Sequence, residues 1–120
     1  MTICYFTATG NSLYVAKRIG GTLLSIPKLM KENEIIINDD AAKKYVVDDN
    51  CILCGTCSKV CPANNISVND KVIFSDKCEV CYACIHNCLK KAIHVKYEKS
   101  SDRFRNEHIA LKKIIEANET

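Results

Sequence analysis

Apolar and polar residues near the start of the chain follow first a strand pattern and then a helix pattern. The short apolar stretch 2–6 (TICYF) predicts a strand, and 11–20 (NSLYVAKRIG) places apolar residues on or near one helical face. A pair of glycines follows and is typical of a helix end. Two further apolar runs, 22–26 and 34–37, are candidate strands. This part of the chain therefore predicts a βα unit with one or two additional strands.

The end of the chain predicts one amphipathic helix over about 107–117. Asn106 is a suitable N-cap and Asn118 a suitable stop. The helix has an apolar stripe formed by Ile109, Ala110, Ile114 and Ala117. This stripe suits docking against the N-terminal βα unit, and a partner protein could use it equally well.

Cysteines organise the middle of the chain. Residues 51–62 read CILCGTCSKVCP and residues 78–88 read CEVCYACIHNC, and both follow C-x2-C-x2-C-x3-C. At an offset of 27 residues the runs also agree at two downstream positions, Ile66/Ile93 and Val68/Val95. The segment is an internal duplication, and each half is a ligand run followed by a short apolar tail.

Nine cysteines in 120 residues are far more than an average chain carries. The N-terminus has no basic region typical of a secretory signal, and no apolar run approaches the ~20 residues of a membrane span. We therefore expect a cytoplasmic protein whose cysteines serve metal or redox centres ahead of disulfides. The ninth cysteine, Cys4, lies in the first predicted strand, where we expect a buried, unreactive thiol.

The spacing within each run fits a cubane [4Fe–4S] cluster. Three cysteines two residues apart can bind three irons, and the fourth ligand must come from elsewhere. A zinc ion needs only two spaced pairs, which leaves the third and fourth cysteines of each run unexplained. We therefore favour two [4Fe–4S] clusters. A cysteine-rich zinc module for protein interaction, and disulfides, are the alternatives.

On these runs, residues 46–97 resemble a bacterial-type ferredoxin with two [4Fe–4S] clusters. In that family the last cysteine of each run binds the other cluster. The implied ligand sets are Cys51, Cys54, Cys57 and Cys88 for cluster I, and Cys78, Cys81, Cys84 and Cys61 for cluster II. The pattern departs at Leu89, where the family usually has proline, and at Tyr82, where the first run has glycine. We therefore expect two unequal clusters.

Apolar neighbours of the cysteines are expected to line the clusters and exclude water. These neighbours are Ile52, Val60, Ile66, Val72, Phe74, Ile85, Ile93 and Val95.

The clusters also change the charge of the protein. An oxidised cubane with four thiolates carries about −2, so two of them lower the formal charge of +3 to about −1. This removes the argument for a nucleic-acid or membrane partner. A basic group after the second run could steer an acidic redox partner, or simply form a solvated face. Its members are Lys90, Lys91, Lys96, Lys99, Arg103 and Arg105.

Between the first predicted strand and helix, residues 7–12 read TATGNS. This loop resembles the FMN phosphate loop of flavodoxins, in which hydroxyls and backbone N–H groups surround the phosphate at a helix N-terminus. The phosphate contacts implied by the resemblance are Thr7, Thr9, Gly10, Asn11 and Ser12. An ordinary capped strand-to-helix turn is the alternative.

The order of parts resembles the EFR1 family of flavodoxin–ferredoxin fusion proteins in shortened form. A flavodoxin sheet has the order 2-1-3-4-5, yet only 50 residues precede Cys51, so strands 3 to 5 have no sequence to form them. The FMN site is therefore incomplete. The βα unit must pack on the ferredoxin part, on the tail helix or on a second copy, and FMN held at such an oligomer interface is an alternative.

The expected fold class is α+β: a two-cluster ferredoxin-like fold with an internal pseudo-twofold repeat, between a truncated flavodoxin-like unit and a C-terminal helix. The corresponding segments are 1–44, 45–98 and 99–120. The expected function is a low-potential, one-electron carrier that works with a redox partner protein. No nucleophile and base suggest an enzyme. Oxygen-sensitive clusters fit an anaerobe.

Overall fold

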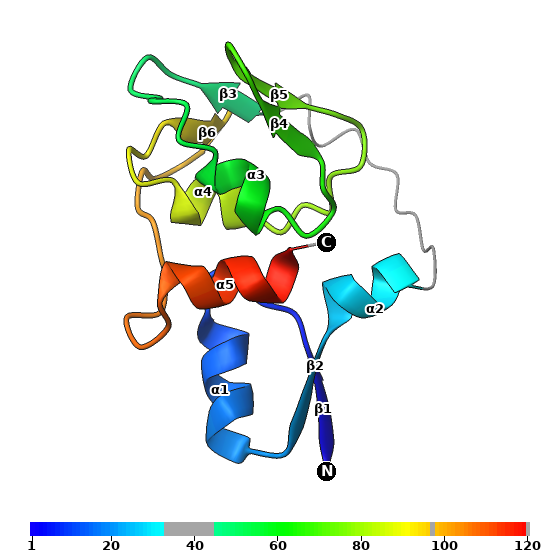
Figure 1. The fold of residues 1–120 in the computed structure, drawn as a ribbon. Helices are drawn as coiled ribbons and strands as arrows, with labels where there is room; N and C mark the ends of the chain where they lie inside the picture. The colour runs from blue at the N-terminus through cyan, green and yellow to red at the C-terminus, as the bar shows by residue number, and fades with distance from the viewer. Residues whose placement is uncertain (33–44, 97, 120) are drawn as a thin grey trace.

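A computed structural model describes residues 1–32, 45–96 and 98–119. Its elements are β1 (Thr2–Tyr5), α1 (Asn11–Ile19), β2 (Thr22–Ser25), α2 (Ile26–Glu32), β3 (Tyr45–Val47), α3 (Thr56–Val60), β4 (Ile66–Val68), β5 (Val72–Phe74), α4 (Ala83–Asn87), β6 (Ile93–Val95) and α5 (Leu111–Asn118). In Figure 1, α5 crosses between the cysteine segment above and β1, α1 and β2 below. None of the described helices is long and apolar enough to cross a membrane.

The N-terminal unit consists of β1, α1, β2 and α2. β1 and β2 pair in parallel with Thr2 opposite Thr22, and α1 connects them. α1 ends at Gly20, whose φ of +85° suits glycine. These elements confirm the predicted strand, helix and glycine stop. The predicted strand 22–26 is one residue shorter because Ile26 begins α2, and the candidate strand 34–37 lies outside the described residues.

The cysteine segment contains two small antiparallel sheets with two short helices. β3 pairs with β6, and β4 pairs with β5. β3 and β5, α3 and α4, and β4 and β6 each start 27 residues apart, which is the offset of the sequence duplication. Each sheet therefore joins a strand from one half to a strand from the other, so neither half is complete alone.

The backbone repeats its unusual conformations at the same offset. Leu53 and Val80 both have φ of +57°, and Asn64 and Lys91 have φ of +53° and +50°. These left-handed conformations are costly for residues other than glycine, at about 1 kcal/mol or more each. Their repetition shows that both halves bend in the same way next to their cysteines.

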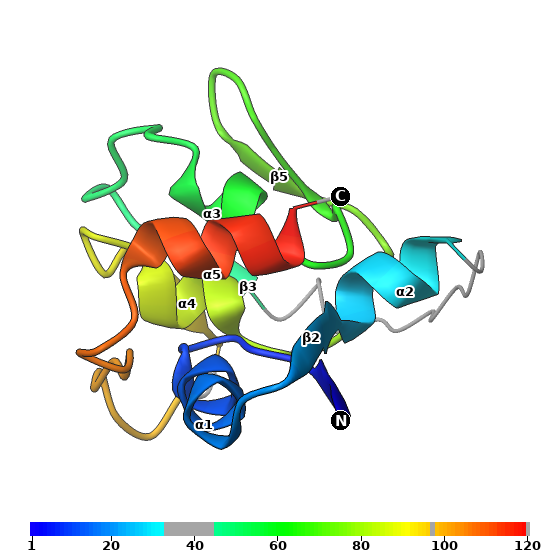
Figure 2. The ribbon, with the colours of Figure 1, turned by 60° about the horizontal axis from the view of Figure 1, so that its bottom comes forward.

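The main core lies where α5 meets both other parts. Five buried residues, Leu13, Val60, Ala83, Ile109 and Ile114, form one contact cluster that joins α1, α3, α4 and the tail. Figure 2 shows α5 in front of α3 and α4, and Figure 1 shows α1 on the side of α5 away from these two helices. The predicted docking of the tail stripe is confirmed for Ile109 and Ile114, which contact both the N-terminal unit and the cysteine segment, whereas Ala110 is exposed.

The predicted start of the tail helix was wrong, whereas its predicted end lies within one residue of the observed one. α5 begins at Leu111, after Ala110, and its N-cap makes no side-chain hydrogen bond. Asn106 instead accepts a hydrogen bond from the His108 N–H (2.8 Å), so its side chain forms a separate turn ahead of the helix. Asn118 is the last helical residue and is fully buried.

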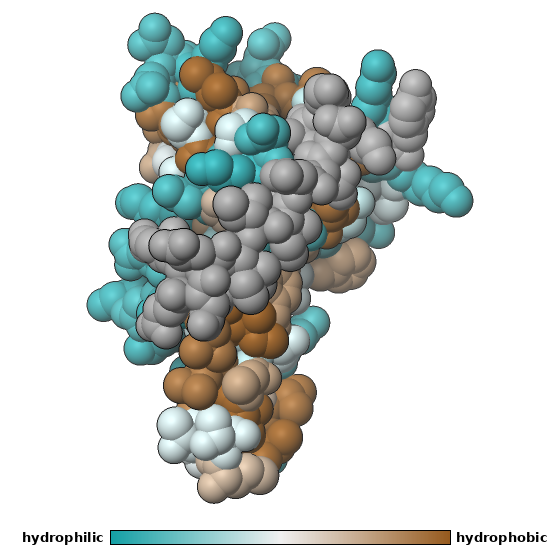
Figure 3. Space-filling view, turned by 90° about the vertical axis from the view of Figure 1, so that its right-hand side faces the viewer, coloured by the Kyte–Doolittle hydropathy of each residue, from teal (hydrophilic) through white to brown (hydrophobic). Residues whose placement is uncertain are grey.

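The prediction of a buried thiol at Cys4 was also wrong. Side chains along β1 alternate, and Ile3 and Tyr5 are half-buried whereas Thr2 and Cys4 are exposed. The reason is the small size of this sheet, because α1 covers only one face of a two-stranded pair. Figure 3 shows apolar side chains over the lower end of the molecule, near β1 and β2, where Met1 and Leu24 are exposed.

Candidate functional site

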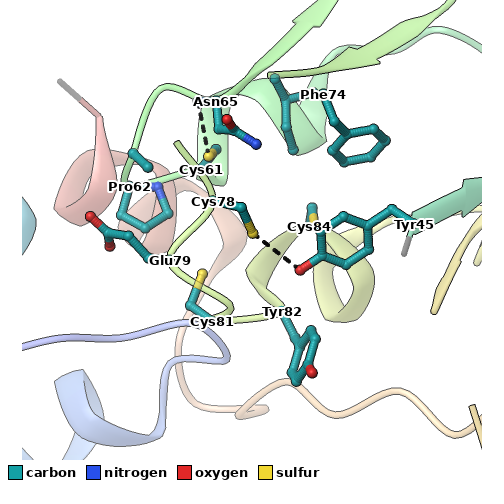
Figure 4. Close-up of a pocket in the computed structure, with 12 residues that line it drawn as sticks. Tyr45, Cys61, Pro62, Asn65, Phe74, Cys78, Glu79, Cys81, Tyr82 and Cys84 are labelled. Carbon is teal, nitrogen blue, oxygen red and sulfur yellow. Dashed lines mark hydrogen bonds between the residues drawn. The ribbon is translucent and has the colours of Figure 1, made fainter. Parts of the chain in front are cut away.

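The eight cysteines of the two runs line two separate cavities. One cavity, here site I, is lined by Cys51, Cys54, Cys57 and Cys88. The other, site II, is lined by Cys61, Cys78, Cys81 and Cys84. Figure 4 shows the four site II sulfurs around a common space. Each site therefore combines three cysteines of one run with the last cysteine of the other. This grouping is the same as that of the predicted ligand sets, and ligation itself stays a prediction.

Backbone N–H groups point at the sulfurs in the same way in both sites. The left-handed turn after the first cysteine of each run directs an N–H back at its sulfur, and a second N–H approaches the last cysteine. Such donors stabilise a thiolate and, in a cluster, help to set its potential. The four contacts are Leu53 to Cys51 (3.5 Å), Val80 to Cys78 (3.3 Å), Asn65 to Cys61 (3.3 Å) and Ala92 to Cys88 (3.4 Å).

Each site has one further contact from a hydroxyl group, at different positions. The Thr56 hydroxyl lies 3.4 Å from Cys54 Sγ in site I and lowers the pKa of that thiol. In site II the Tyr45 hydroxyl lies 3.4 Å from Cys78 Sγ. Burial and the neighbouring Cys78 raise the pKa of Tyr45, so this phenol stays protonated and can donate. The repeat thus shares its backbone donors but not its side-chain hydroxyl contacts.

Burial makes four of these thiols poor acids. It raises the pKa of Cys57 to about 11 and that of Cys81 to about 12. The pKa values of Cys61 and Cys84 are also raised, mainly by burial. Buried thiolates need a nearby positive charge, and a bound metal centre supplies it. The sites are therefore suited to cysteines that are held as metal ligands.

The arrangement does not suit a single metal ion. Among residues 1–32, 45–96 and 98–119, no three His, Cys, Asp or Glu side chains are close enough to hold one ion. A zinc site requires its thiolates around one centre, with Zn–S distances of about 2.3 Å. A cubane instead binds each thiolate to a different iron, which keeps the sulfurs further apart. The donor set fits a [4Fe–4S] cluster better than zinc.

The two sites differ most in how they are covered. Cys54 of site I is exposed. Its counterpart in site II, Cys81, packs against the core that contains Leu13 and Ile114. Figure 4 shows Cys81 next to the blue N-terminal segment. The N-terminal unit and α5 therefore cover one site and leave the other open.

Most predicted apolar neighbours line the sites as expected. Ile66, Ile85 and Ile93 are buried in one cluster with Cys57 and Cys84. Ile52 lines the site I cavity as predicted, but it is 59% exposed, so the expectation that it excludes water was wrong. Val60 is buried, but in the core with Leu13 and Ile114 and not in this cluster.

A buried asparagine joins the cysteine segment to the N-terminal loop. Asn87, in α4, is only 2% exposed, and its Nδ2 donates to the Ala8 carbonyl (2.7 Å). Sequence reasoning missed it, although a signal exists: at the repeat offset Asn87 corresponds to Val60, a buried apolar residue. A polar residue at a position that is buried in the other half indicates a hydrogen-bond partner within the protein. Asn118 acts similarly and donates to the Thr7 and Val60 carbonyls.

One member of the predicted basic group is not available at the surface. The Arg103 side chain is 6% exposed and forms an ion pair with Glu98 (3.2 Å). Glu98 also contacts His94 Nδ1 (2.7 Å), and the other ring nitrogen contacts Asp48 (2.8 Å). The prediction that Arg103 helps to steer a partner was therefore wrong, because the side chain belongs to this network beside β6.

Within the predicted phosphate loop, the first residues bond to the chain itself. Thr7 is 1% exposed, and its hydroxyl accepts a hydrogen bond from the Gly10 N–H (2.9 Å). Gly10 is packed so tightly that a Cβ there would lie 2.9 Å from Ile109 Cβ. The Thr9 carbonyl accepts a hydrogen bond from the Asn106 N–H (2.7 Å). The tail therefore covers this end of the loop.

The last two residues of the loop, Asn11 and Ser12, are less covered by the tail. The Asn11 side chain accepts a hydrogen bond from the Asn106 amide (3.0 Å). Asn11 and Ser12 both line an open hollow between β1 and α1. The five residues are close in space, yet the Thr7 hydroxyl, the Gly10 N–H and the Asn11 side-chain oxygen are already hydrogen-bonded within the protein. The structure does not support a flavin site here.

Comparisons with known proteins match the cysteine segment. Residues 43–89 match the family model described as a 4Fe-4S dicluster domain. The chain is also 40% identical over 55 residues to a subunit of the ion-translocating oxidoreductase complex of Methanosarcina acetivorans. That similarity covers 44% of this chain and 21% of the relative, so the chain spans about a fifth of its length. No solved structure matches the chain. The chain thus contains a 4Fe–4S ferredoxin-type segment, and the flavodoxin–ferredoxin fusion is not shown.

Proposed function

We propose that this ferredoxin-type chain is an electron-transfer protein with two [4Fe–4S] clusters, one in each site, that passes electrons one at a time. The carrying observation is that two cavities each have four cysteines, three from one run and one from the other. The proposal includes the crossed ligand sets and a pseudo-twofold relation between the halves. The match to a 4Fe-4S dicluster domain supports the same cluster type.

The residues around the sites have clear roles in this proposal. When bound, a cubane cluster supplies one-electron chemistry at iron. The backbone N–H groups orient the cysteine sulfurs and stabilise their negative charge. Buried isoleucines keep water away from the sulfurs. Apolar surroundings disfavour the added negative charge of the reduced state, which agrees with the low potential that we propose.

A redox partner is the second part of the proposal. The similar protein from Methanosarcina acetivorans is, by its name, part of an oxidoreductase complex. We propose that this chain likewise exchanges electrons with a partner protein, in the cytoplasm, and acts as a carrier and not as a catalyst of bond formation.

The alternatives have less support. A zinc module conflicts with the lack of any single-ion arrangement among the described residues. An FMN site shared between two copies needs a free phosphate loop, yet Thr7, Gly10 and Asn11 are bonded within the chain or tightly packed. Contact between two copies of the N-terminal unit stays a prediction.

Elemental analysis of the anaerobically purified protein tests the proposal. We expect about eight irons and about eight acid-labile sulfides per chain, because each cubane contains four of each. The same samples give zinc and flavin contents and an absorption spectrum. Zinc without sulfide would overturn the proposal in favour of an interaction module. One tightly held flavin per chain would instead revive the FMN alternative.

A further inference from the structure

The rim of site I differs from the rim of site II at equivalent positions. Two apolar residues that line site I are exposed, Ile52 by 59% and Leu53 by 43%. Leu89, between the lining residues Cys88 and Lys90, is exposed by 60%, and we count it with the rim. Their counterparts 27 residues away, in site II, are buried or half-buried. These counterparts are Glu79, Val80 and Pro62. Exposed apolar residues that are gathered around one cavity indicate a contact surface, whereas apolar residues exposed singly do not.

Site II is closed on the corresponding side by the protein itself. Cys81 packs against a core built from α1 and α5, whereas its counterpart Cys54 is exposed. An electron moves more readily between groups that approach closely. A partner protein can therefore come closer to site I than to the side of site II that the N-terminal unit covers.

Lysines accompany the apolar rim. Lys90 lines site I, and Lys91 follows it at the surface. Lys59 is exposed in the last turn of α3, two residues after the site I residue Cys57. No carboxylate of the described residues forms an ion pair with these three lysines.

Acidic groups near this rim are fewer. Asp49 is exposed just before the first cysteine, while Asp48 contacts His94. Asp70 and Lys71, which precede the site I residue Val72, are both exposed, and their charges offset each other. The excess of the three lysines over Asp49 favours a negatively charged partner surface.

We propose that the rim of site I is the docking surface for an acidic one-electron redox protein, which offers an apolar contact area bordered by carboxylates. This rests on the proposed function. On contact, one electron leaves the reduced [4Fe–4S] centre of site I, which is oxidised by one electron, and the partner's redox group is reduced by one. No atom or proton is transferred. The small patch suits a brief encounter, for which steering by charge matters more than area.

Stopped-flow oxidation of the reduced, cluster-loaded full chain tests the charge of the partner. The acceptors are cytochrome b5, an acidic haem protein, and cytochrome c, a basic one. For the double variant Lys90→Glu with Lys91→Glu, we expect the rate with the acidic acceptor to fall about tenfold at low salt. The rate with the basic acceptor rises, and both differences shrink at high salt.

The matched control is Lys17→Glu with Arg18→Glu, which changes net charge equally on the exposed face of α1. We expect it to change either rate by less than about twofold, because α1 is not at the rim. Equal effects of the two double variants would show that only net charge matters, and would overturn the docking surface.

A second pair of variants tests the apolar part of the rim. Leu89→Ser and Ile19→Ser replace residues of similar exposure, 60% and 58%. At high salt, only Leu89→Ser should slow oxidation by the acidic acceptor, by about threefold or more. Unchanged rates for both variants would contradict the apolar contact.

Iron and sulfide counts on every sample separate the two proposals. A wild-type chain without clusters would overturn the proposed function and the docking surface with it. If the wild type holds both clusters but the rim variants are oxidised at the wild-type rate, the docking surface alone would be overturned. If the double variant Lys90→Glu with Lys91→Glu reduces cluster content, the double variant Lys90→Gln with Lys91→Gln is used in its place. We then expect a smaller fall in the rate of oxidation by the acidic acceptor.

Discussion

Site I and site II are built from the same repeated backbone, but they have different surroundings. Both take three cysteines from one run and one from the other, and both receive two backbone N–H groups at equivalent sulfurs. Site I is open at Cys54, whereas Cys81 lies against the core formed with α1 and α5. The duplication explains the donor set, and the elements added at either end of the chain make the sites unequal.

The interior of the two sites differs as well. Tyr45 of site II corresponds to Val72 of site I at the repeat offset, and only the tyrosine can donate to a sulfur. Thr56 of site I corresponds to Ala83 of site II, so here only site I has a hydroxyl next to a sulfur. Aromatic rings also surround Tyr45, since it stacks on Phe74 at 5.1 Å between centroids. Small substitutions after duplication were enough to separate the two environments.

The largest expected effect comes from removing a cysteine. Cys54→Ala and Cys88→Ala should each lose the cluster of site I, because both residues line that cavity. Iron should fall from about eight to about four per chain, and both variants should keep the same electron paramagnetic resonance (EPR) signal. Cys61→Ala should keep the other signal. The crossed arrangement fails if Cys88→Ala instead matches Cys81→Ala.

The cover over site II is tested by weakening the core. Ile114 is fully buried in α5, so Ile114→Ala should lower the free energy of unfolding by about 2–5 kcal/mol. Because Cys81 packs against this core, an iron chelator should then remove the site II cluster faster while site I keeps its rate.

Ile73→Ala is the control for this core variant. Ile73 is 43% exposed, so this change should alter stability by no more than about 0.5 kcal/mol. Equal acceleration of cluster loss at both sites in Ile114→Ala would mean that the core protects the whole segment and not site II in particular.

The hydroxyl contacts predict a smaller, site-specific change in potential. A hydrogen bond to a cluster sulfur favours the more negative, reduced state and so raises the potential. Tyr45→Phe should therefore lower the potential of site II only, and Thr56→Val that of site I only. Redox titration followed by EPR resolves the two. A shift of both clusters in either variant would argue against separate environments.

The smallest expected effect concerns the ion network beside site I. Glu98 and then Asp48 raise the pKa of His94, so the folded protein holds this proton more tightly than the unfolded chain. The stabilisation is complete below the ordinary histidine pKa of about 6.5 and is lost as pH rises through the raised value. The melting temperature of the wild type should exceed that of His94→Gln at pH 6 by more than at pH 9.

The carboxylates that contact His94 set the acid end of the pH range in which the network stabilises the fold. The pKa of Glu98 is lowered mainly by His94, and that of Asp48 by the Asn50 N–H and then by His94. Their contribution is present at neutral pH and is lost as pH falls through the lowered values. The wild-type advantage over His94→Gln should therefore also decline in strong acid. A constant difference across this range would show that His94 acts by packing alone.

The sequence was sufficient where chemistry or periodicity is local. Cysteine spacing predicted the ferredoxin-type segment, and the apolar pattern with two glycines predicted β1 and the end of α1. Exposure was harder, because it depends on which elements cover a residue. Cys4 was expected to be buried as in a large sheet, but its two-stranded sheet leaves one face open.

The relation between the loop and the tail was also beyond the sequence. TATGNS has residues suited to a phosphate, yet the partners of Gly10 are Ile109 and Asn106, almost 100 residues away. Only the packed structure shows that these groups meet. Beside the apolar stripe of the tail, a polar residue where the repeat has an apolar one, Asn87 against Val60, was a further signal of contact between distant segments.

The central claim is that the duplicated segment forms two unequal one-electron centres. A redox titration of the anaerobic protein, followed by EPR, tests it most directly. We expect two resolved reductions that together take up about two electrons per chain, and the step that Tyr45→Phe moves belongs to site II. A single reduction step, or no signal from a reduced [4Fe–4S] cluster, would contradict the account.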